Sequence, residues 1–374
     1  MVAMSSEPVV SSDPAVEDPM PLDGIDHVEL WVGNADQAAF YFCQAFGFRE
    51  IAYAGLETGV RDRASHVVRQ GAITLVLTGA LGSASPIAEH HRRHGDGVKV
   101  IALSVPDAAR AYATALERAA TGVAEPHEVA DEHGTVKLAT IATYGDTLHT
   151  FVERSGYRGA FLPGYAARED DTPAAGLLAI DHIVGNVERM QDWVSYYEKV
   201  FGMREMLHFS DRDLSTEYSA LMSKVMADGS GRVKFPINEP AEGKRRSQID
   251  EFLEYYEGAG AQHIAVATED IVGTVDHLAA RGVEFLRTPD AYYEEAPGRV
   301  GEIDEDMEDL RRLGILVDRD DEGYLLQVFT KPIGDRPTVF LEVIERHGAR
   351  GFGDGNFKAL FEAIEREQAL RGNL

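Results

Sequence analysis

The sequence predicts an α+β fold of two tandem halves, from an internal repeat and from alternating strand patterns. The chain has 374 residues, enough for two or three domains at roughly 150 residues each. His27 and Gly47 return as His182 and Gly202, both at the same offset of 155 positions. Each copy indicates a strand and then a helix, with glycine just past the helix end, where it is common.

The repeat continues toward the end of each half. In both copies a second strand leads into a helical pattern, and a further strand closes the half. The matched segments are 97–103 with 260–266, 108–119 with 271–280, and 150–153 with 339–342. Alternating apolar positions in these strands predict curved sheets with one buried face.

The pattern divides the chain into four regions. Residues 1–20 are rich in Ser, Pro and acidic residues, which predicts a disordered tail. The first half then covers 21–155, and a linker with Gly, Pro and acidic residues covers 156–175. The second half covers 176–374.

A C-terminal helix is predicted over 356–370. Its apolar residues lie on one stripe, and Asn356 is a suitable N-cap. The stripe contains Phe357, Leu360, Phe361 and Ile364.

The composition excludes several classes of partner. With 36 basic and 63 acidic residues, the formal net charge is −27, so phosphate backbones and anionic lipids are repelled. We therefore expect no nucleic-acid and no membrane partner, and no apolar run is long enough for a span. The N-terminus does not resemble a secretory signal, and Cys43, the only cysteine, is expected to be buried and inert. These features predict a cytoplasmic protein.

Three residues of the second half form a candidate metal site. His182, His263 and Glu342 each lie in a predicted strand. Two imidazoles and one carboxylate are the ligands that hold Fe(II) in a facial triad and leave positions open for substrate and dioxygen. Each histidine alone is more typical of an ordinary buried strand residue.

The first half provides an internal control for that site. Its matched positions are His27, Val100 and Glu153. Because valine cannot bind a metal, we expect the first half to be metal-free. A separate group, His90, His91 and His94, lies beside two arginines and is expected on the solvated surface.

The repeat resembles the vicinal oxygen chelate fold, in which paired βαββ modules form curved, open barrels around a metal. The second half closely resembles the 4-hydroxyphenylpyruvate dioxygenase family. The segments that carry this resemblance are KFPINEP at 234–240, KRRSQIDEF at 244–252, EGAGAQHIA at 257–265, YLLQVFTKP at 324–332, RPTVFLE at 336–342 and GFGDGNFKALF at 351–361.

The family resemblance implies a reaction and a cofactor. Fe(II) and dioxygen would act on 4-hydroxyphenylpyruvate, with loss of CO2, ring hydroxylation and side-chain migration to give homogentisate, a step of tyrosine catabolism. The keto and carboxylate oxygens of the substrate would chelate the iron. No flavin or nicotinamide is implied.

The resemblance also implies which residues contact the substrate. Ser223, Asn238 and Gln248 would be the polar catalytic contacts, with Gln262 and Gln327 as further substrate contacts. Aromatic walls would come from Phe329, Phe340, Phe352 and Phe357, the last two on a C-terminal lid. Gln262 precedes His263, so ideal strand alternation predicts that its side chain points to the other face.

Three alternatives remain open. A 4-hydroxymandelate synthase uses the same substrate and iron but hydroxylates the benzylic carbon; Pro236, Asn238 and Phe357 favour ring hydroxylation instead. An extradiol ring-cleaving enzyme fits the triad but not the long insertion and lid. A non-catalytic binding protein would lack the intact triad. The apolar faces of the first half are expected to support the second half and a homodimer or homotetramer interface.

Overall fold

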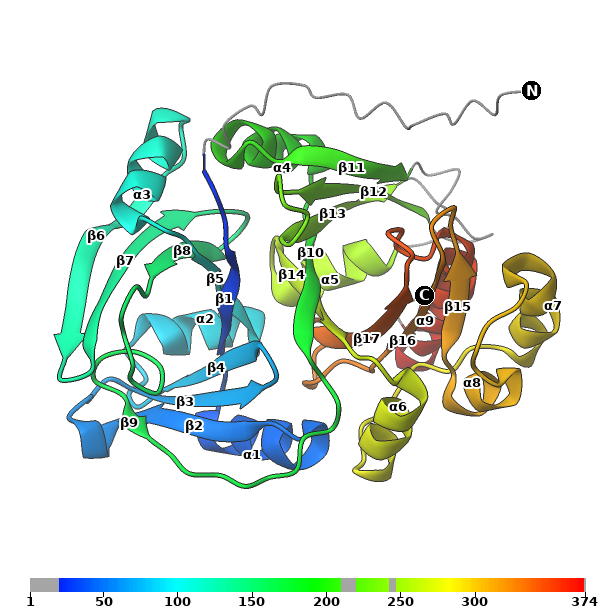
Figure 1. The fold of residues 1–374 in the computed structure, drawn as a ribbon, viewed down its shortest axis with the longest axis horizontal. Helices are drawn as coiled ribbons and strands as arrows, with labels where there is room; N and C mark the ends of the chain where they lie inside the picture. The colour runs from blue at the N-terminus through cyan, green and yellow to red at the C-terminus, as the bar shows by residue number, and fades with distance from the viewer. Residues whose placement is uncertain (1–19, 210–219, 242–246, 373–374) are drawn as a thin grey trace, which may run out of the picture.

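Two curved sheets lie side by side, each with helices packed against it (Figure 1). The computed structural model describes residues 20–209, 220–241 and 247–372. Residues 1–19 of the predicted tail lie outside this part of the chain, and Met20 is already buried.

The first sheet has nine strands in the order β6-β7-β8-β5-β1-β4-β3-β2-β9. Its strands are β1 (Gly24–Trp31), β2 (Arg49–Ala54), β3 (Arg63–Gln70), β4 (Ile73–Ala80), β5 (Gly97–Ser104), β6 (Gly122–Asp131), β7 (Gly134–Ala142), β8 (Leu148–Glu153) and β9 (Ala166–Ala167). Its helices are α1 (Ala35–Phe46), the 3-10 turn η1 (Leu56–Thr58), α2 (Pro86–His94) and α3 (Ala108–Glu117).

The second sheet has eight strands in the order β11-β12-β13-β10-β14-β17-β16-β15. Its strands are β10 (Ala179–Asn186), β11 (Arg204–Phe209), β12 (Ala220–Ala227), β13 (Lys234–Ala241), β14 (Gly260–Ala267), β15 (Leu316–Arg319), β16 (Tyr324–Phe329) and β17 (Phe340–His347). Its helices are α4 (Met190–Tyr196), the π-helical turn η2 (Tyr197–Phe201), α5 (Gln248–Tyr256), α6 (Ile271–Ala280), α7 (Asp290–Val300), α8 (Met307–Leu313), the 3-10 turn η3 (Asp354–Asn356) and α9 (Phe357–Arg371).

The two sheets share one topology, which confirms the predicted α+β fold of paired modules. β1 pairs parallel with β4 and antiparallel with β5, as β10 does with β13 and β14. In each module three strands follow the helix, one more than in the βαββ shorthand. The division into 21–155, 156–175 and 176–374 stays a prediction; residues of its linker add β9 to the first sheet.

The glycines predicted at the ends of the first helix of each half have that role. Asn34 caps α1 through its side chain, and Gly47 ends the helix with φ 71°. Gly202 ends the corresponding helical segment with φ 70°, after the π-helical turn η2. Glycine fits these left-handed positions because it has no Cβ.

The strand register corrects one prediction about the repeat. Ala102 of β5 pairs with Thr150, and the equivalent Ala265 of β14 pairs with Glu342. Thr150, not Glu153, is therefore the counterpart of Glu342. Glu153 corresponds instead to Glu345, because their Oε2 atoms accept hydrogen bonds from the first amides of α3 and α6 at 3.1 and 2.7 Å.

A buried aromatic group joins the two halves. The Tyr197 hydroxyl lies 2.9 Å from His149 Nε2, and Phe235 packs on both rings. Burial lowers the pKa of His149 to about 4, so its imidazole is neutral and can accept from the tyrosine. One continuous core includes residues of both halves, such as Phe151 and Phe201.

The prediction for the histidine group of α2 was wrong for two of its three members. His90 and His94 are buried, because α2 packs against α5 of the other half. His94 stacks on the Tyr256 ring at 4.3 Å, and its Nε2 lies 2.9 Å from Asp146 Oδ2. Only His91 is substantially exposed.

The C-terminal helix α9 packs against the second sheet and α5 (Figure 1). Leu360, Phe361 and Ile364 of the predicted stripe all face the protein interior. Asn356 stands at the predicted N-cap position, but its side chain makes no cap hydrogen bond. Its Oδ1 instead accepts from the Tyr292 hydroxyl of α7 at 2.5 Å, which fixes the start of α9.

Two further expectations concern the environment of the chain. No helix in the described ranges is long and apolar enough to cross a membrane. Cys43 is buried in α1, as predicted, and burial raises the pKa of its thiol to about 12.

Candidate metal centre and substrate cavity

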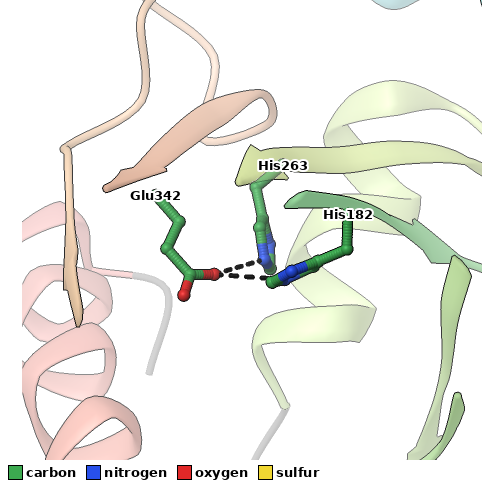
Figure 2. Close-up of side chains that lie close together, drawn as sticks. All are labelled: His182, His263 and Glu342. Carbon is green, nitrogen blue, oxygen red and sulfur yellow. Dashed lines mark ion pairs between the residues drawn. The ribbon is translucent and has the colours of Figure 1, made fainter. Parts of the chain in front are cut away.

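His182, His263 and Glu342 converge at one point on the second sheet (Figure 2). They come from β10, β14 and β17, which are adjacent in the sheet. Glu342 Oε2 lies 3.3 Å from His182 Nε2 and 3.2 Å from His263 Nε2. All three residues are buried.

A hydrogen bond orients each imidazole. Asp181 Oδ1 lies 2.7 Å from His182 Nδ1, and Gln262 Oε1 lies 3.0 Å from His263 Nδ1. Carboxylate and amide oxygens accept, so both Nδ1 atoms carry the proton. Both Nε2 atoms are then free to bind a metal, the usual arrangement of histidine ligands.

Two β-bulges create this arrangement. The pairing of β10 with β14 shifts between Ile180 and His182, which leaves Asp181 as the extra residue. It shifts again opposite Val184, which leaves Gln262 as the extra residue. Bulges re-aim side chains, so Gln262 and His263 line the same cavity. The expectation from ideal alternation that Gln262 points to the other face is therefore wrong.

Two cations hold Asp181 beside His182. Arg346 Nε and Nη2 each donate to a different Asp181 carboxylate oxygen at 2.9 Å, and Lys234 Nζ lies 3.2 Å from Oδ2. Burial alone would raise the pKa of Asp181, but the hydrogen bonds from His182 and Arg346 and the charge of Arg346 hold it well below its usual range. Asp181 is thus a carboxylate at neutral pH.

The charge of Glu342 fits a metal ligand. Burial by itself would raise the pKa of Glu342, but the adjacent His182 and His263 lower it to about 2. Cis ligands about 2.1 Å from a metal lie about 3 Å apart, close to the separations found here. The donor set, its burial and its geometry therefore fit a divalent metal.

Aromatic rings surround one side of the metal centre. Phe340 stacks on His263 at 4.8 Å, Phe329 meets His263 edge-on at 6.0 Å, and Phe352 meets His182 edge-on at 4.9 Å. All three line a cavity that opens from the three candidate ligands. Flat apolar walls of this kind suit an aromatic ligand.

Polar side chains also line the cavity. Ser223 and Asn238 are directly paired on β12 and β13, and the Asn238 amide lies 3.3 Å from Asn186 Oδ1. Gln248 begins α5, where the Ser247 N-cap fixes the helix start. These predicted contacts and Gln262 all line the cavity.

Two predicted contacts differ from the others. Gln327 is buried but does not belong to the cavity lining. It lies on the same face of β16 as Phe329, but Gly353 covers it: a Cβ at Gly353 would come 2.5 Å from Gln327 Nε2. Phe357 begins α9, and its side chain lies outside the described part of the structure.

The cavity also contains residues that the sequence argument did not single out as contacts. Phe361 and Leu360 come from the apolar stripe of α9, which was the available signal for them. Val184 and Val225 lie two residues beyond His182 and Ser223 on their strands, so strand alternation would have identified them. Pro236, which already favoured ring hydroxylation in the sequence, belongs to the same lining.

A second group with metal-binding residue types is explained by the fold. Glu305, Glu345 and His347 lie close together, with His347 Nε2 2.8 Å from Glu345 Oε1 and 3.2 Å from Glu305 Oε1. Glu345 also caps α6 through its other oxygen. This cluster therefore connects α6 to the sheet.

Comparison with known proteins places both halves in described families. Residues 179–328 match the Glyoxalase/Bleomycin resistance protein/Dioxygenase superfamily, and residues 16–162 match the N-terminal model of hydroxyphenylpyruvate dioxygenase. The chain resembles a triple mutant of 4-hydroxymandelate synthase from Streptomyces coelicolor, with a TM-score of 0.84 at 35% identity, covering 93% of this chain and 100% of that one.

Curated relatives match nearly the whole chain. The 4-hydroxyphenylpyruvate dioxygenase of Dictyostelium discoideum is 49% identical, covering 94% of this chain and 100% of its own length. That of Aspergillus fumigatus is also 49% identical, with 94% of each chain covered. The chain therefore belongs to the 4-hydroxyphenylpyruvate dioxygenase family.

Proposed function

We propose that this chain is an Fe(II)-dependent dioxygenase that converts 4-hydroxyphenylpyruvate and O2 to homogentisate and CO2. The observation that carries the proposal is the convergence of two imidazoles and a carboxylate at the end of an aromatic cavity. Membership of the dioxygenase family supports the substrate and the reaction.

His182, His263 and Glu342 would hold the iron. A facial triad of this kind selects non-haem Fe(II) and leaves the positions toward the cavity for substrate and dioxygen. When bound, Fe(II) supplies the redox chemistry by which O2 reacts with an α-keto acid. Asp181 and Gln262 keep the Nδ1 protons in place, so both imidazoles remain neutral ligands.

The aromatic walls position the substrate ring and exclude water. Phe329, Phe340, Phe352 and Phe361 come from three different elements and the segment before η3, so the ring is enclosed from several directions. An aromatic pair contributes about 0.5–1.5 kcal/mol beyond the area that it buries. Water exclusion protects the reactive centre from side reactions.

The polar residues orient the two ends of the substrate. We assign Ser223, Asn238 and Gln248 to catalytic contacts, with Gln262 beside the metal ligand His263. Asn238 and Asn186 form a buried pair, so a substrate oxygen at Asn238 would meet a donor that is already oriented. Gln327 would reach the substrate only if Gly353 moved away from it.

Oxygen uptake by Fe(II)-loaded protein with 4-hydroxyphenylpyruvate tests this function, with the product identified by NMR. Homogentisate and one CO2 per O2 are the expected result. Absence of uptake in protein that contains stoichiometric iron would contradict the proposed substrate. The same experiment without Fe(II), or with Zn(II) instead, should give no uptake.

The structural likeness to a 4-hydroxymandelate synthase favours one alternative, oxidation at the benzylic carbon. That enzyme class shares the substrate, so only the product separates the two. Asn238 and Pro236 lie at the cavity wall, where the ring is expected. 4-Hydroxymandelate as the product would overturn our assignment of these two residues.

We propose that the chain forms a homodimer or homotetramer. Phe40 and Tyr41 of α1 in the first half are exposed, and Phe40 is 68% exposed. Burying such rings against a second copy would remove apolar surface from water. Light scattering on a sizing column should give a mass of two or four chains, and a 41 kDa monomer would contradict the proposal.

A further inference from the structure

Arg346 connects the metal centre to the chain segment that leads into α9. We define this approach segment as residues 348–353, between β17 and η3. On one side, Arg346 binds both carboxylate oxygens of Asp181, which orients His182. On the other side, its Nη1 donates to the carbonyls of Gly351 at 2.7 Å and Ala349 at 3.2 Å.

The connection closes into a ring through Phe352. The guanidinium lies 5.4 Å from the Phe352 ring centre, and that ring meets His182 at 4.9 Å. Phe352 is also a wall of the substrate cavity. One arginine therefore contacts the carboxylate behind a metal ligand, the backbone of the approach segment and an aromatic wall.

The first half contains the same unit around His27, with Val100 and Thr150 at the positions of His263 and Glu342. Arg154 binds both oxygens of Asp26 at 2.6 and 2.8 Å, and Asp26 lies 2.6 Å from His27 Nδ1. Arg154 also donates to the carbonyl of Phe161 and lies 5.1 Å from its ring. Phe161 meets His27 edge-on at 5.0 Å.

The shared unit shows what the arginine does in general. In both halves the arginine binds the backbone of a returning segment, the segment that follows β8 or β17. A phenylalanine of that segment then packs on His27 in the first half and on His182 in the second. In the first half the returning segment fills the sheet with Phe161. In the second half the same geometry sets the position of the cavity wall relative to a metal ligand.

We propose that Arg346 is a positioning residue that couples the approach segment, and with it Phe352, to the metal ligand His182. This inference rests on the proposed function for the role of the metal. Through Asp181, Arg346 fixes the orientation of an imidazole; through Gly351, it fixes the wall against which the substrate ring packs. Loss of the arginine would disturb both at once.

The test compares Arg346→Gln with Arg154→Gln, its matched control in the first half. The affinity for Co(II), as the metal alone, is measured by competition with a chelator and by the visible absorption of the bound ion. Arg346→Gln should weaken binding about 10- to 100-fold, as is typical when a group supporting a histidine ligand is lost. Arg154→Gln should change it less than about twofold.

Hydrogen exchange of the approach segment provides the second measurement. It should become at least about tenfold faster in metal-free Arg346→Gln protein, but not in Arg154→Gln protein. Unchanged Co(II) affinity and exchange in Arg346→Gln would overturn the proposal. Equal losses of affinity in both variants would also overturn it, because the effect would then be general destabilisation.

Arg346→Lys separates charge from geometry and serves if the glutamine variant does not fold. Lysine keeps a positive charge near Asp181. Its single nitrogen cannot replace the three guanidinium nitrogens that bind the two Asp181 oxygens and the Gly351 carbonyl. Co(II) affinity should return to within about threefold of wild type, while exchange of the approach segment stays fast. Slow, wild-type exchange in this variant would contradict the coupling. If wild-type protein binds Co(II) but its Fe(II) form does not oxidise 4-hydroxyphenylpyruvate, the proposed function fails while these measurements still test the coupling.

Discussion

The two halves of this chain share a scaffold and differ at two residues of the candidate site. In both, a bulged aspartate orients a histidine, and an arginine binds the aspartate. The second half then has His263 and Glu342 where the first has Val100 and Thr150. The supporting network is therefore not evidence for a metal, whereas the other two ligands are.

The comparison also shows how each half fills its curved sheet. In the first half, Phe161 packs on His27 and joins an apolar cluster with Val67 and Val76. In the second half, the equivalent ring, Phe352, leaves a cavity beside the three candidate ligands. A segment that closes one half thus becomes a wall of the site in the other.

The largest expected difference between the halves comes from removing the carboxylate ligand. Glu342→Ala should abolish stoichiometric iron binding and lower turnover at least about 10³-fold, because a metal ligand supplies several kcal/mol. Thr150→Ala loses only a hydroxyl contact to Thr140, so iron and turnover should be unchanged and stability should fall by at most about 1 kcal/mol. Iron content is measured by metal analysis and turnover by oxygen uptake. Loss of iron in Thr150→Ala protein would contradict the strand register that matches Thr150 with Glu342.

A second pair of variants tests the shared aspartate. Asp26→Asn and Asp181→Asn should each destabilise the metal-free protein by about 2 to 3 kcal/mol, because each leaves a half-buried arginine without its anion. Only Asp181→Asn should also weaken iron binding, by about 10- to 100-fold. Urea unfolding measures the stability and metal competition measures the iron affinity. An equal loss of iron affinity in both variants would contradict a metal site in the second half alone.

The first half also permits the opposite experiment. Val100→His with Thr150→Glu would place a second imidazole and a carboxylate beside the existing His27. We expect a second, weaker metal equivalent, at a cost of about 1 to 3 kcal/mol for burying polar groups among apolar neighbours. Equilibrium dialysis with Co(II) counts the equivalents. A count that stays at one would mean that Phe161 and its neighbours leave no room for an ion.

The smallest effect is expected at Phe361, a wall contributed by α9. Phe361→Leu should cost about 1 to 2 kcal/mol of stability because it leaves a small cavity beside Val225 and Ile249. The KM for 4-hydroxyphenylpyruvate should rise several-fold with kcat nearly unchanged, since the ring loses a wall but the metal keeps its ligands. A fall in kcat with unchanged KM would contradict this role.

Much of the fold and the three candidate ligands could be predicted because the chain contains its own comparison. The gap-free repeat matched His182 with His27 in the sequence, and the family motifs identified most residues of the cavity lining. The last strand was misaligned because Thr150-Phe151-Val152-Glu153 and Val339-Phe340-Leu341-Glu342 share a phenylalanine and a glutamate at the same spacing. An apolar pattern alone does not fix register, and the match of Glu153-Arg154 with Glu345-Arg346 was the better signal.

The remaining differences come from tertiary structure. Gln262 faces the cavity because a bulge interrupts the alternation of β14. His90 and His94 are buried because the other half covers α2, which local sequence cannot reveal. Asn356 does not cap α9 because its oxygen is taken by Tyr292 and Arg299 of α7, far away in the sequence.

The stoichiometry of Fe(II) in the wild-type chain tests the central claim most directly. Metal-free protein is titrated with Fe(II) in the absence of oxygen, and bound iron is counted per chain. One tight equivalent is the result we predict, held by the second half. Two equivalents would contradict the metal-free first half, and none would contradict the metal centre itself.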